Sequence, residues 1–206
     1  MKLFYFPGAC SLGIHVLLEE IGAPYEPVLV DLRSGAHKAP EYVEINPKSK
    51  VPALLRDNGR VLTEWPAIAL YLARLHPAAG LLPADLEEEA DAVSVVEYIV
   101  STMHMQGFGR LYRPERFAMS EADFDAVRAV GKEMFLGGLE MIGQRLEGRD
   151  YVAGGRFSIA DAALLFVTFW AARAEMPLPA SVAAHFARMK QRTSVQTVFS
   201  REGLAL

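Results

Sequence analysis

The chain has a single cysteine among its 206 residues, so it has no internal disulfide. This absence excludes the small disulfide-stapled folds of secreted proteins and suits a reducing compartment. No apolar run is long enough to span a bilayer, and the N-terminus has neither the basic segment nor the cleavage site of a signal peptide. We therefore expect a soluble, cytoplasmic protein with no membrane partner.

Positive charge is also scarce: 21 Lys and Arg against 25 Asp and Glu give a formal net charge of −4. Phosphate backbones require a concentrated basic surface, so a nucleic-acid partner is not expected. No metal is expected either, because there is no cysteine pair and no His-Glu-x-x-His motif. What is present, 51% hydrophobic and 22% charged residues, fits a globular protein with a sizeable core.

The first third of the chain alternates short β-rich runs with helical patterns. The last two β-rich runs flank Asp57-Asn58-Gly59, a strong hairpin signal, whereas residues 33–46 give no clear pattern. We expect strands at Leu3–Phe6, Pro27–Leu32, Val51–Leu55 and Arg60–Thr63, and helices at Ser11–Ile21 and directly after Glu64.

The composition changes at HPAAGLLPADLEEEA, where prolines, a glycine and an acidic run indicate a linker. Beyond it nearly every segment is predicted to be helical: Asp85–Tyr112, a helix opened by a capping box at Ser120 and ending near Leu146, and the apolar helix Ile159–Ala172. We therefore predict two domains, an α/β domain at residues 1–76 and an all-α domain at residues 86–206, joined by a linker at residues 77–85.

Cys10 stands in the loop segment PGACSLG, between a strand pattern and a helix pattern. There a thiol faces the unpaired N–H groups of the first helical turn, and the helix dipole favours a thiolate of lowered pKa. A reactive thiol and a small buried side chain are both consistent with this placement. Gly13 stands where a Cys-x-x-Cys motif needs its second thiol, so any redox product is a mixed disulfide with an external thiol.

Three further positions are candidates for a binding site. Val51-Pro52 begins a strand-like run, and on frequency alone its peptide bond is expected to be trans. Glu64 stands at a helix N-terminus, so it can cap that helix or accept from a ligand ammonium, while the free N–H groups can bind a carboxylate. His104 lies in the long predicted helix, where a lone histidine is more often surface or core. Asp161 is interpreted as a structural cap.

Five segments of the chain, taken together, resemble the bacterial cytosolic glutathione transferases, above all the beta class. They are MKLFYFPGACSL, NPKSKVPALL, LTEWPAIALYLA, SIADAALL and RTSVQTVFSREGL, and the resemblance covers essentially the whole chain. It implies a thioredoxin-like N-terminal domain of order β-α-β-α-β-β-α, an all-helical C-terminal domain and a homodimer. It also implies glutathione as co-substrate and a small hydrophobic electrophile as the second substrate.

The same resemblance assigns roles to individual residues. Cys10 would lie beside the glutathione sulfur, able to form a mixed disulfide with it, and Ser11 would be a neighbour that donates to the thiolate. Val51-Pro52, with a cis bond, would exchange backbone hydrogen bonds with the cysteinyl part of glutathione. Glu64 and the backbone N–H of Trp65 would hold the γ-glutamyl end. The implied chemistry is attack by the glutathione thiolate on an electrophile, or thiol–disulfide exchange through Cys10.

The chain departs from the family pattern at several positions. Trp65 replaces the Ser or Gly that usually follows Glu64, so its ring would either fill part of the glutathione site or point into the domain interface. Met105 and Gln106 replace a His-Lys pair, and His104, kept as a glutathione-site candidate, stands one position earlier, about 100° away around the helix. These departures leave two alternatives open: a non-catalytic binding protein on the same fold, and a glutathione-dependent reductase or lyase.

Overall fold

Two compact units make up the part of the chain that the structure describes. The structure is a computed structural model and describes residues 1–205. One unit consists of Met1–Pro83 together with the chain from Ala187 onward, and the other is Ala84–Phe186. The C-terminal helix therefore packs in the same unit as the N-terminal sheet. The domain boundaries expected from the sequence, 1–76 and 86–206, stay predictions.

The first unit is built on a four-stranded mixed sheet of order β2-β1-β3-β4. β3 runs antiparallel to both β1 and β4, so the predicted hairpin is confirmed, and β1 is parallel to β2. β2 ends at Leu29 rather than at Leu32, because its partner β1 ends at Tyr5, the residue opposite Leu29. The strands are β1 (Lys2–Tyr5), β2 (Glu26–Leu29), β3 (Ala53–Leu55) and β4 (Val61–Thr63).

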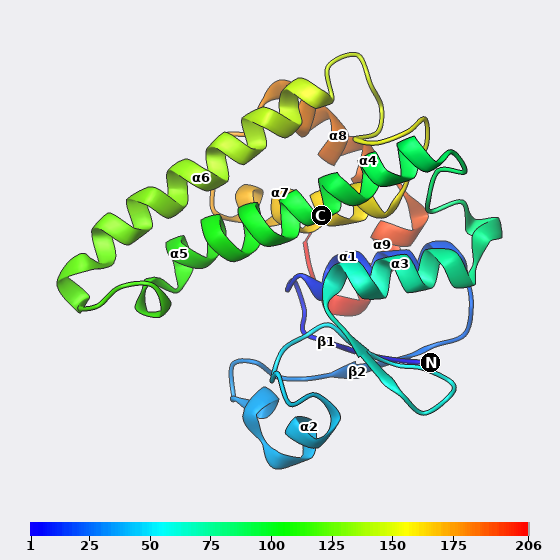
Figure 1. Ribbon diagram of the computed structural model, residues 1–206, viewed down its shortest axis with the longest axis horizontal. Helices are drawn as coiled ribbons and strands as arrows, with labels where there is room; N and C mark the ends of the chain where they lie inside the picture. The colour runs from blue at the N-terminus through cyan, green and yellow to red at the C-terminus, as the bar shows by residue number, and fades with distance from the viewer. Residues whose placement is uncertain (206) are drawn as a thin grey trace. The chain divides into compact units, whose positions relative to one another are not determined.

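Helices cover both faces of this sheet (Figure 1). α1 (Ser11–Ile21) and α3 (Trp65–Leu75) lie side by side on one face, and α2 (Pro40–Ile45) lies on the other. The β-α-β-α-β-β-α order expected of a thioredoxin-like domain is thereby confirmed, with α2 arising from the segment that gave no clear sequence pattern. The unit is completed by η1 (Ala36–Lys38), η2 (Pro77–Ala79) and α9 (Thr193–Glu202).

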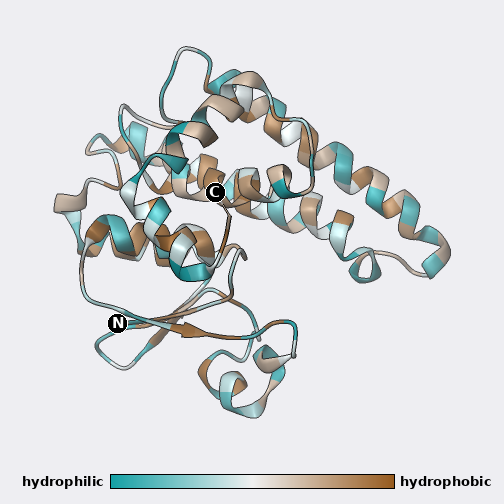
Figure 2. Cartoon of the chain, turned by 180° about the vertical axis from the view of Figure 1, so that it is seen from behind, coloured by the Kyte–Doolittle hydropathy of each residue, from teal (hydrophilic) through white to brown (hydrophobic). Residues whose placement is uncertain are grey.

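Apolar side chains on the two faces of the sheet hold this unit together. On one face Phe4, Tyr42 and Val51 belong to a buried cluster, and on the other α1 and α3 bury Leu17 and Ile68 completely. Full burial of one such side chain contributes about 1.5–3 kcal/mol. Figure 2 shows the corresponding pattern, with hydrophobic residues along the strands and alternating hydrophobic and hydrophilic positions on the helices.

α9 joins the first unit through ion pairs with α1. Arg192 donates from Nε and Nη2 to the two carboxylate oxygens of Glu20, each at 2.8 Å, and Arg201 pairs with Glu19. Two parallel bonds between a guanidinium and a carboxylate fix orientation as well as distance. The last helix of the chain is thus held against the helix that follows Cys10.

The second unit is all-helical, as predicted. The expected helix over Asp85–Tyr112 is continuous but not uniform, because a π-helical stretch, η3, separates two α-helical parts. Hydrophobic periodicity in the sequence does not distinguish an α-helical from a π-helical hydrogen-bond pattern over a stretch as short as η3. Within residues 1–205, no helix is both long and apolar enough to cross a bilayer. The elements are α4 (Leu86–Glu97), η3 (Tyr98–Phe108), α5 (Gly109–Tyr112), η4 (Pro114–Arg116), η5 (Glu121–Asp123), α6 (Phe124–Arg145), α7 (Ile159–Arg173) and α8 (Ala180–Lys190), the last of which contains the unit boundary.

α6 lies directly alongside η3 and α5 and approaches them closely at its glycines (Figure 1). A Cβ added at Gly131 would stand 2.7 Å from both the Gly107 carbonyl oxygen and the Leu111 nitrogen. These are backbone atoms, so they cannot move aside as a flexible side chain could. Gly137 lies in the same helix, but a Cβ there meets nothing within 4 Å.

We expect Gly131→Ala to destabilise the protein by about 1–3 kcal/mol, because the added methyl overpacks a backbone contact. Gly137→Ala is the matched control and should be neutral or stabilising by up to about 1 kcal/mol, the helix-propensity difference between Gly and Ala. Urea unfolding of the two variants measures the difference. Equal midpoints for both would contradict the close approach of α6 to η3.

Candidate functional site

Cys10 lies at the end of a short loop that joins β1 to α1. Gly8 has a φ of 70° and Ala9 donates its N–H to the Phe6 carbonyl, so the loop turns sharply before the helix begins. A glycine suits Gly8, because a left-handed φ is strained for other residues. Cys10 itself occupies the N-cap position of α1 in a helical conformation. The sequence-based position of the thiol, at a helix N-terminus, is therefore observed.

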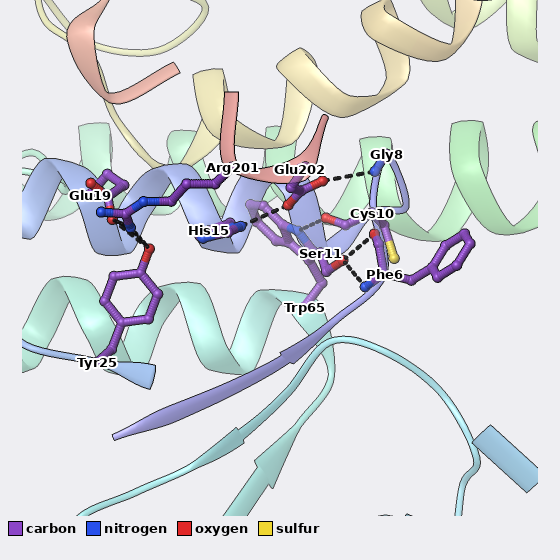
Figure 3. Close-up of polar contacts among 10 residues, drawn as sticks. All are labelled: Phe6, Gly8, Cys10, Ser11, His15, Glu19, Tyr25, Trp65, Arg201 and Glu202. Atoms are coloured by element: carbon purple, nitrogen blue, oxygen red, sulfur yellow. Dashed lines mark hydrogen bonds and ion pairs between the residues drawn. The ribbon is translucent and has the colours of Figure 1, made fainter. Parts of the chain in front are cut away.

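The Ser11 hydroxyl is fully buried and bonded to the backbone of Phe6. It accepts from the Phe6 N–H at 3.3 Å and donates to the Phe6 carbonyl at 3.2 Å (Figure 3). A hydroxyl has one hydrogen to donate, so this arrangement uses it. Ser11 here closes the loop around Cys10, and donation to a thiolate would require it to exchange this partner.

The Cys10 thiol lies beside the Val51-Pro52 peptide. Its Sγ donates to the Val51 carbonyl oxygen at 3.5 Å, across 41 positions of sequence. The Val51-Pro52 bond is cis, so the trans isomer expected on frequency alone is wrong, and the isomer implied by the family resemblance is observed. Two segments chosen separately from the sequence thus meet in the structure.

Burial dominates the ionisation of Cys10. It raises the pKa of the thiol to about 12, although the backbone N–H groups of Cys10 and Ser11 and the nearby Lys50 lower it, and Glu64 raises it further. The N–H groups at the helix end favour a thiolate, as the sequence indicated, but burial outweighs them, so the net lowering of the pKa expected from the sequence is not observed. A half-charge at a helix end does not compensate the cost of removing a full charge from water.

Glu64 is strained in its backbone and exposed in its side chain. Its φ of 71° lies in the left-handed region, which costs a non-glycine residue about 1–3 kcal/mol. Its side chain does not cap α3, so the simple capping role is wrong. Instead it accepts from Lys48 Nζ at 2.7 Å, and Lys48 also donates to the Thr63 hydroxyl. The start of α3 therefore carries an ion pair between two long, flexible side chains. A ligand with both an ammonium and a carboxylate could replace this pairing by binding each side chain separately.

Trp65 turns inward. Only 3% of its surface is exposed, and its Nε1–H donates to the Cys10 carbonyl at 2.9 Å (Figure 3). Of the two positions considered for its ring, filling the glutathione site or pointing into the domain interface, neither describes this contact with the start of α1. The substitution that set this chain apart from the family pattern therefore links α3 directly to the thiol loop.

Sequence analysis missed a second link to this loop. Glu202, at the end of α9, accepts from the Gly8 N–H at 2.8 Å and bonds to His15 Nδ1 at 2.7 Å, and both side chains are fully buried (Figure 3). Nothing in the sequence indicates that a carboxylate near residue 200 lies beside residue 8. The helix predicted over Ser11–Ile21 likewise gave no partner for the His15 ring.

His104 and Asp161 belong to the other unit. His104 lies on η3 with its ring edge-on to Phe166 and Trp170, at centroid distances of 5.6 and 4.8 Å. Its role toward glutathione stays a prediction. Asp161 accepts from the N–H groups of Val152 and Ser158 and bonds to His185, so its interpretation as a structural cap is confirmed.

Two other features of the described chain do not coincide with the predicted site. A hollow of about 570 Å³ lies beside the α1 and α9 ion pairs, and none of the predicted site residues lines it. In residues 1–205 no cluster of three or more His, Cys, Asp or Glu side chains could hold a metal ion. The chemistry of the first unit therefore centres on the loop around Cys10.

Known proteins are similar to this chain along its whole length. The glutathione S-transferase N-terminal domain family matches residues 1–74, and the glutathione S-transferase C-terminal domain family matches residues 125–193. The glutathione S-transferase GstA of Escherichia coli O157:H7 is 38% identical over 208 residues, which are 99% of this chain and 100% of that protein.

Solved structures show the same similarity. A glutathione transferase homolog from Sulfitobacter, with bound glutathione, has a TM-score of 0.92 at 30% identity, over 99% of this chain and 98% of that one. A bacterial beta class enzyme from Sphingomonas chungbukensis has a TM-score of 0.87 at 33% identity, over the full length of both chains.

We expect Cys10 in the free protein to react slowly with iodoacetamide at pH 7. The rate should rise about tenfold per pH unit up to pH 10 without levelling, because a thiol of pKa about 12 is still mostly protonated there. The protein unfolded in urea should instead level off above about pH 9, as an ordinary thiol does. A plateau near neutral pH in the folded protein would show that the helix end outweighs burial.

Proposed function

The chain belongs to the glutathione S-transferase family, and from this premise we propose how its own residues serve that chemistry. It is a glutathione transferase-like enzyme, and its resemblance to the bacterial beta class is confirmed. The observation that carries the mechanism is the Cys10 thiol at the start of α1, where it donates to the Val51 carbonyl and where burial raises its pKa. Glutathione is the co-substrate.

The cysteinyl part of glutathione binds along the Val51-Pro52 peptide. The Val51 carbonyl, which accepts from the Cys10 thiol in the free protein, becomes available to the backbone N–H of the ligand when that thiol turns away. This exchange brings the glutathione sulfur next to Cys10. The protein loses one weak hydrogen bond and gains a stronger N–H···O bond.

The γ-glutamyl end binds at the start of α3. The ligand ammonium donates to the Glu64 carboxylate. The ligand carboxylate accepts from the backbone N–H of Trp65 in the first turn of the helix, where the dipole favours an anion. The Lys48–Glu64 pair opens as this happens, since both side chains are largely exposed and their mutual attraction in water is worth no more than about 1 kcal/mol. Lys48 then pairs with the ligand carboxylate.

The glutathione thiolate is the nucleophile, and Cys10 is its hydrogen-bond donor. A protonated Sγ–H can donate to the glutathione sulfur, whereas two adjacent thiolates would repel each other. Glutathione first loses its thiol proton to solvent. In the transfer step its sulfur then forms a bond to an electrophilic carbon, and the leaving group departs with the electron pair of the broken bond. Ser11 closes the loop and holds Cys10 in place.

Conjugation is favoured over thiol–disulfide exchange by the same observation. Exchange needs Cys10 as a thiolate, and burial raises the pKa of the Cys10 thiol well above neutral pH, so the protonated form predominates. Trp65, Met105 and Gln106 motivated the non-catalytic alternative, and of these three residues Trp65 has a ring that is buried and bonded to Cys10. A reductase or lyase has no specific observation in its favour.

The remaining assignments are proposals from the family. The second substrate is a small hydrophobic electrophile, His104 in the second unit contributes to the glutathione site, and the protein acts as a homodimer. The cytoplasm is its location, because a reducing compartment keeps the single thiol free.

Titration calorimetry of the reduced protein with glutathione should give saturable binding. Glu64→Ala should weaken it about tenfold or more, because a charge-assisted hydrogen bond to the ligand ammonium is lost. Arg128→Ala, at an exposed ion pair in the second unit, is the matched control and should bind as the unchanged protein does. If no heat of binding appears, the proposed function is wrong.

Cys10 variants separate conjugation from exchange. Cys10→Ala should lower kcat for conjugation to an aryl chloride about tenfold, because one donor to the thiolate is lost while the nucleophile remains. The same variant should lose all activity on glutathione mixed disulfides. Cys10→Ser, which keeps an O–H donor, should recover most of the conjugation rate. Full conjugation activity in a Cys10→Ala, Ser11→Ala double variant would refute the assigned roles.

A further inference from the structure

Trp65 makes a contact that its backbone role does not require. Its Nε1–H donates to the Cys10 carbonyl at 2.9 Å, although the two residues are 55 positions apart, and 97% of its surface is buried, since only 3% remains exposed. Phenylalanine or leucine would fill such a space without a hydrogen bond. An indole that is buried and directed at one particular carbonyl points to a specific use of its N–H.

The bonded carbonyl belongs to the peptide unit between Cys10 and Ser11. A trans peptide is planar, so its C=O and N–H point in opposite directions. When the indole holds the carbonyl on the side of α3, the Ser11 N–H is directed to the opposite side. That N–H is one of the two backbone groups that lower the pKa of the Cys10 thiol, so it belongs to the groups that favour a thiolate there.

We propose that the Trp65 side chain is a positioning residue for the thiol site: by holding the Cys10 carbonyl it aims the Ser11 N–H at sulfur. In the free protein that sulfur is Cys10 Sγ. During conjugation the same N–H lies beside the adjacent glutathione thiolate, and this second statement rests on the proposed function. Trp65 thus has two separate roles: its backbone N–H donates to the ligand carboxylate, and its indole N–H donates to the Cys10 carbonyl in the loop.

Other charged groups near the thiol do not substitute for this contact. Lys50 lowers the pKa of Cys10 and Glu64 raises it, but both act through space and neither bonds the loop backbone. Behind the loop, Glu202 accepts from the Gly8 N–H, two residues before Cys10, and is itself bonded to His15. Within α1 the Gly13 N–H also donates to the Cys10 carbonyl, at 3.3 Å, and the Trp65 indole adds a shorter bond to the same carbonyl from another helix, at 2.9 Å.

The test compares alkylation of Cys10 with and without the indole N–H, and it needs no glutathione. Trp65→Phe removes the N–H, and replacement by 3-benzothienylalanine removes it while preserving the shape of the ring. Trp170 is the other tryptophan of the chain, so Trp170→Phe serves as the parent in which that replacement is confined to residue 65. Rates of iodoacetamide reaction are measured at pH 9, well below the pKa of the thiol.

We expect both variants to alkylate about fivefold more slowly than the parent, because losing one N–H bond to a thiolate costs about as much as a typical hydrogen bond. A side chain that only packs would behave differently, since loosening the loop would expose the thiol and speed its reaction. An unchanged or faster rate in the folded benzothienyl protein would overturn the proposal. Thermal unfolding midpoints within a few degrees of the parent establish that the protein compared is folded.

A kinetic measurement tests the second statement. In Trp65→Phe, kcat for conjugation should fall about fivefold while KM for glutathione stays within about twofold, because the ligand contact is made by the backbone N–H. A raised KM with unchanged kcat would overturn the positioning role. If the unchanged protein does not bind glutathione at all, the proposed function fails, but the alkylation result still decides the role of the indole.

Discussion

The position of the Cys10 thiol depends on one short loop that is restrained mainly by groups from elsewhere in the chain. Between β1 and α1 the backbone has only a few internal hydrogen bonds. Fixing the backbone of each residue costs about 1–2 kcal/mol in conformational entropy, and other contacts must offset this cost before the thiol is held in one place. Three distant groups supply that restraint: the Val51 carbonyl on the thiol, the Trp65 indole on the Cys10 carbonyl and the Glu202 carboxylate on the Gly8 N–H. Ser11 adds a local closure to Phe6.

The C-terminal helix α9 contributes to this restraint, because it packs against α1 in the first unit. α9 is held on α1 by ion pairs at Glu19 and Glu20, and it brings Glu202 to the loop from the opposite end of the sequence. A buried carboxylate needs hydrogen bonds to compensate for lost hydration, and here the Gly8 N–H and the His15 ring provide them. The contacts that hold α9 against α1 therefore also help to position the loop around Cys10.

Burial decides the chemistry of the thiol. A helix N-terminus by itself favours a thiolate, but the loop encloses Cys10 between α1 and the Val51-Pro52 peptide, and desolvation raises its pKa to about 12. A neutral thiol beside a bound thiol ligand acts as a hydrogen-bond donor rather than as the attacking group. The same burial that fixes the position of the sulfur thus favours its protonated form.

The sequence by itself determined the four strands, the hairpin, the capping boxes, the position of the single thiol and the family, because these depend on local periodicity, turn residues and short contiguous motifs, whereas α2 lies in a segment that gave no clear pattern. Only the tertiary structure decided the protonation of Cys10, the inward turn of Trp65, the pairing of Glu64 with Lys48 and the approach of Glu202 to Gly8. Each of these depends on burial or on atoms far apart in the chain, and neither quantity is encoded in a local pattern.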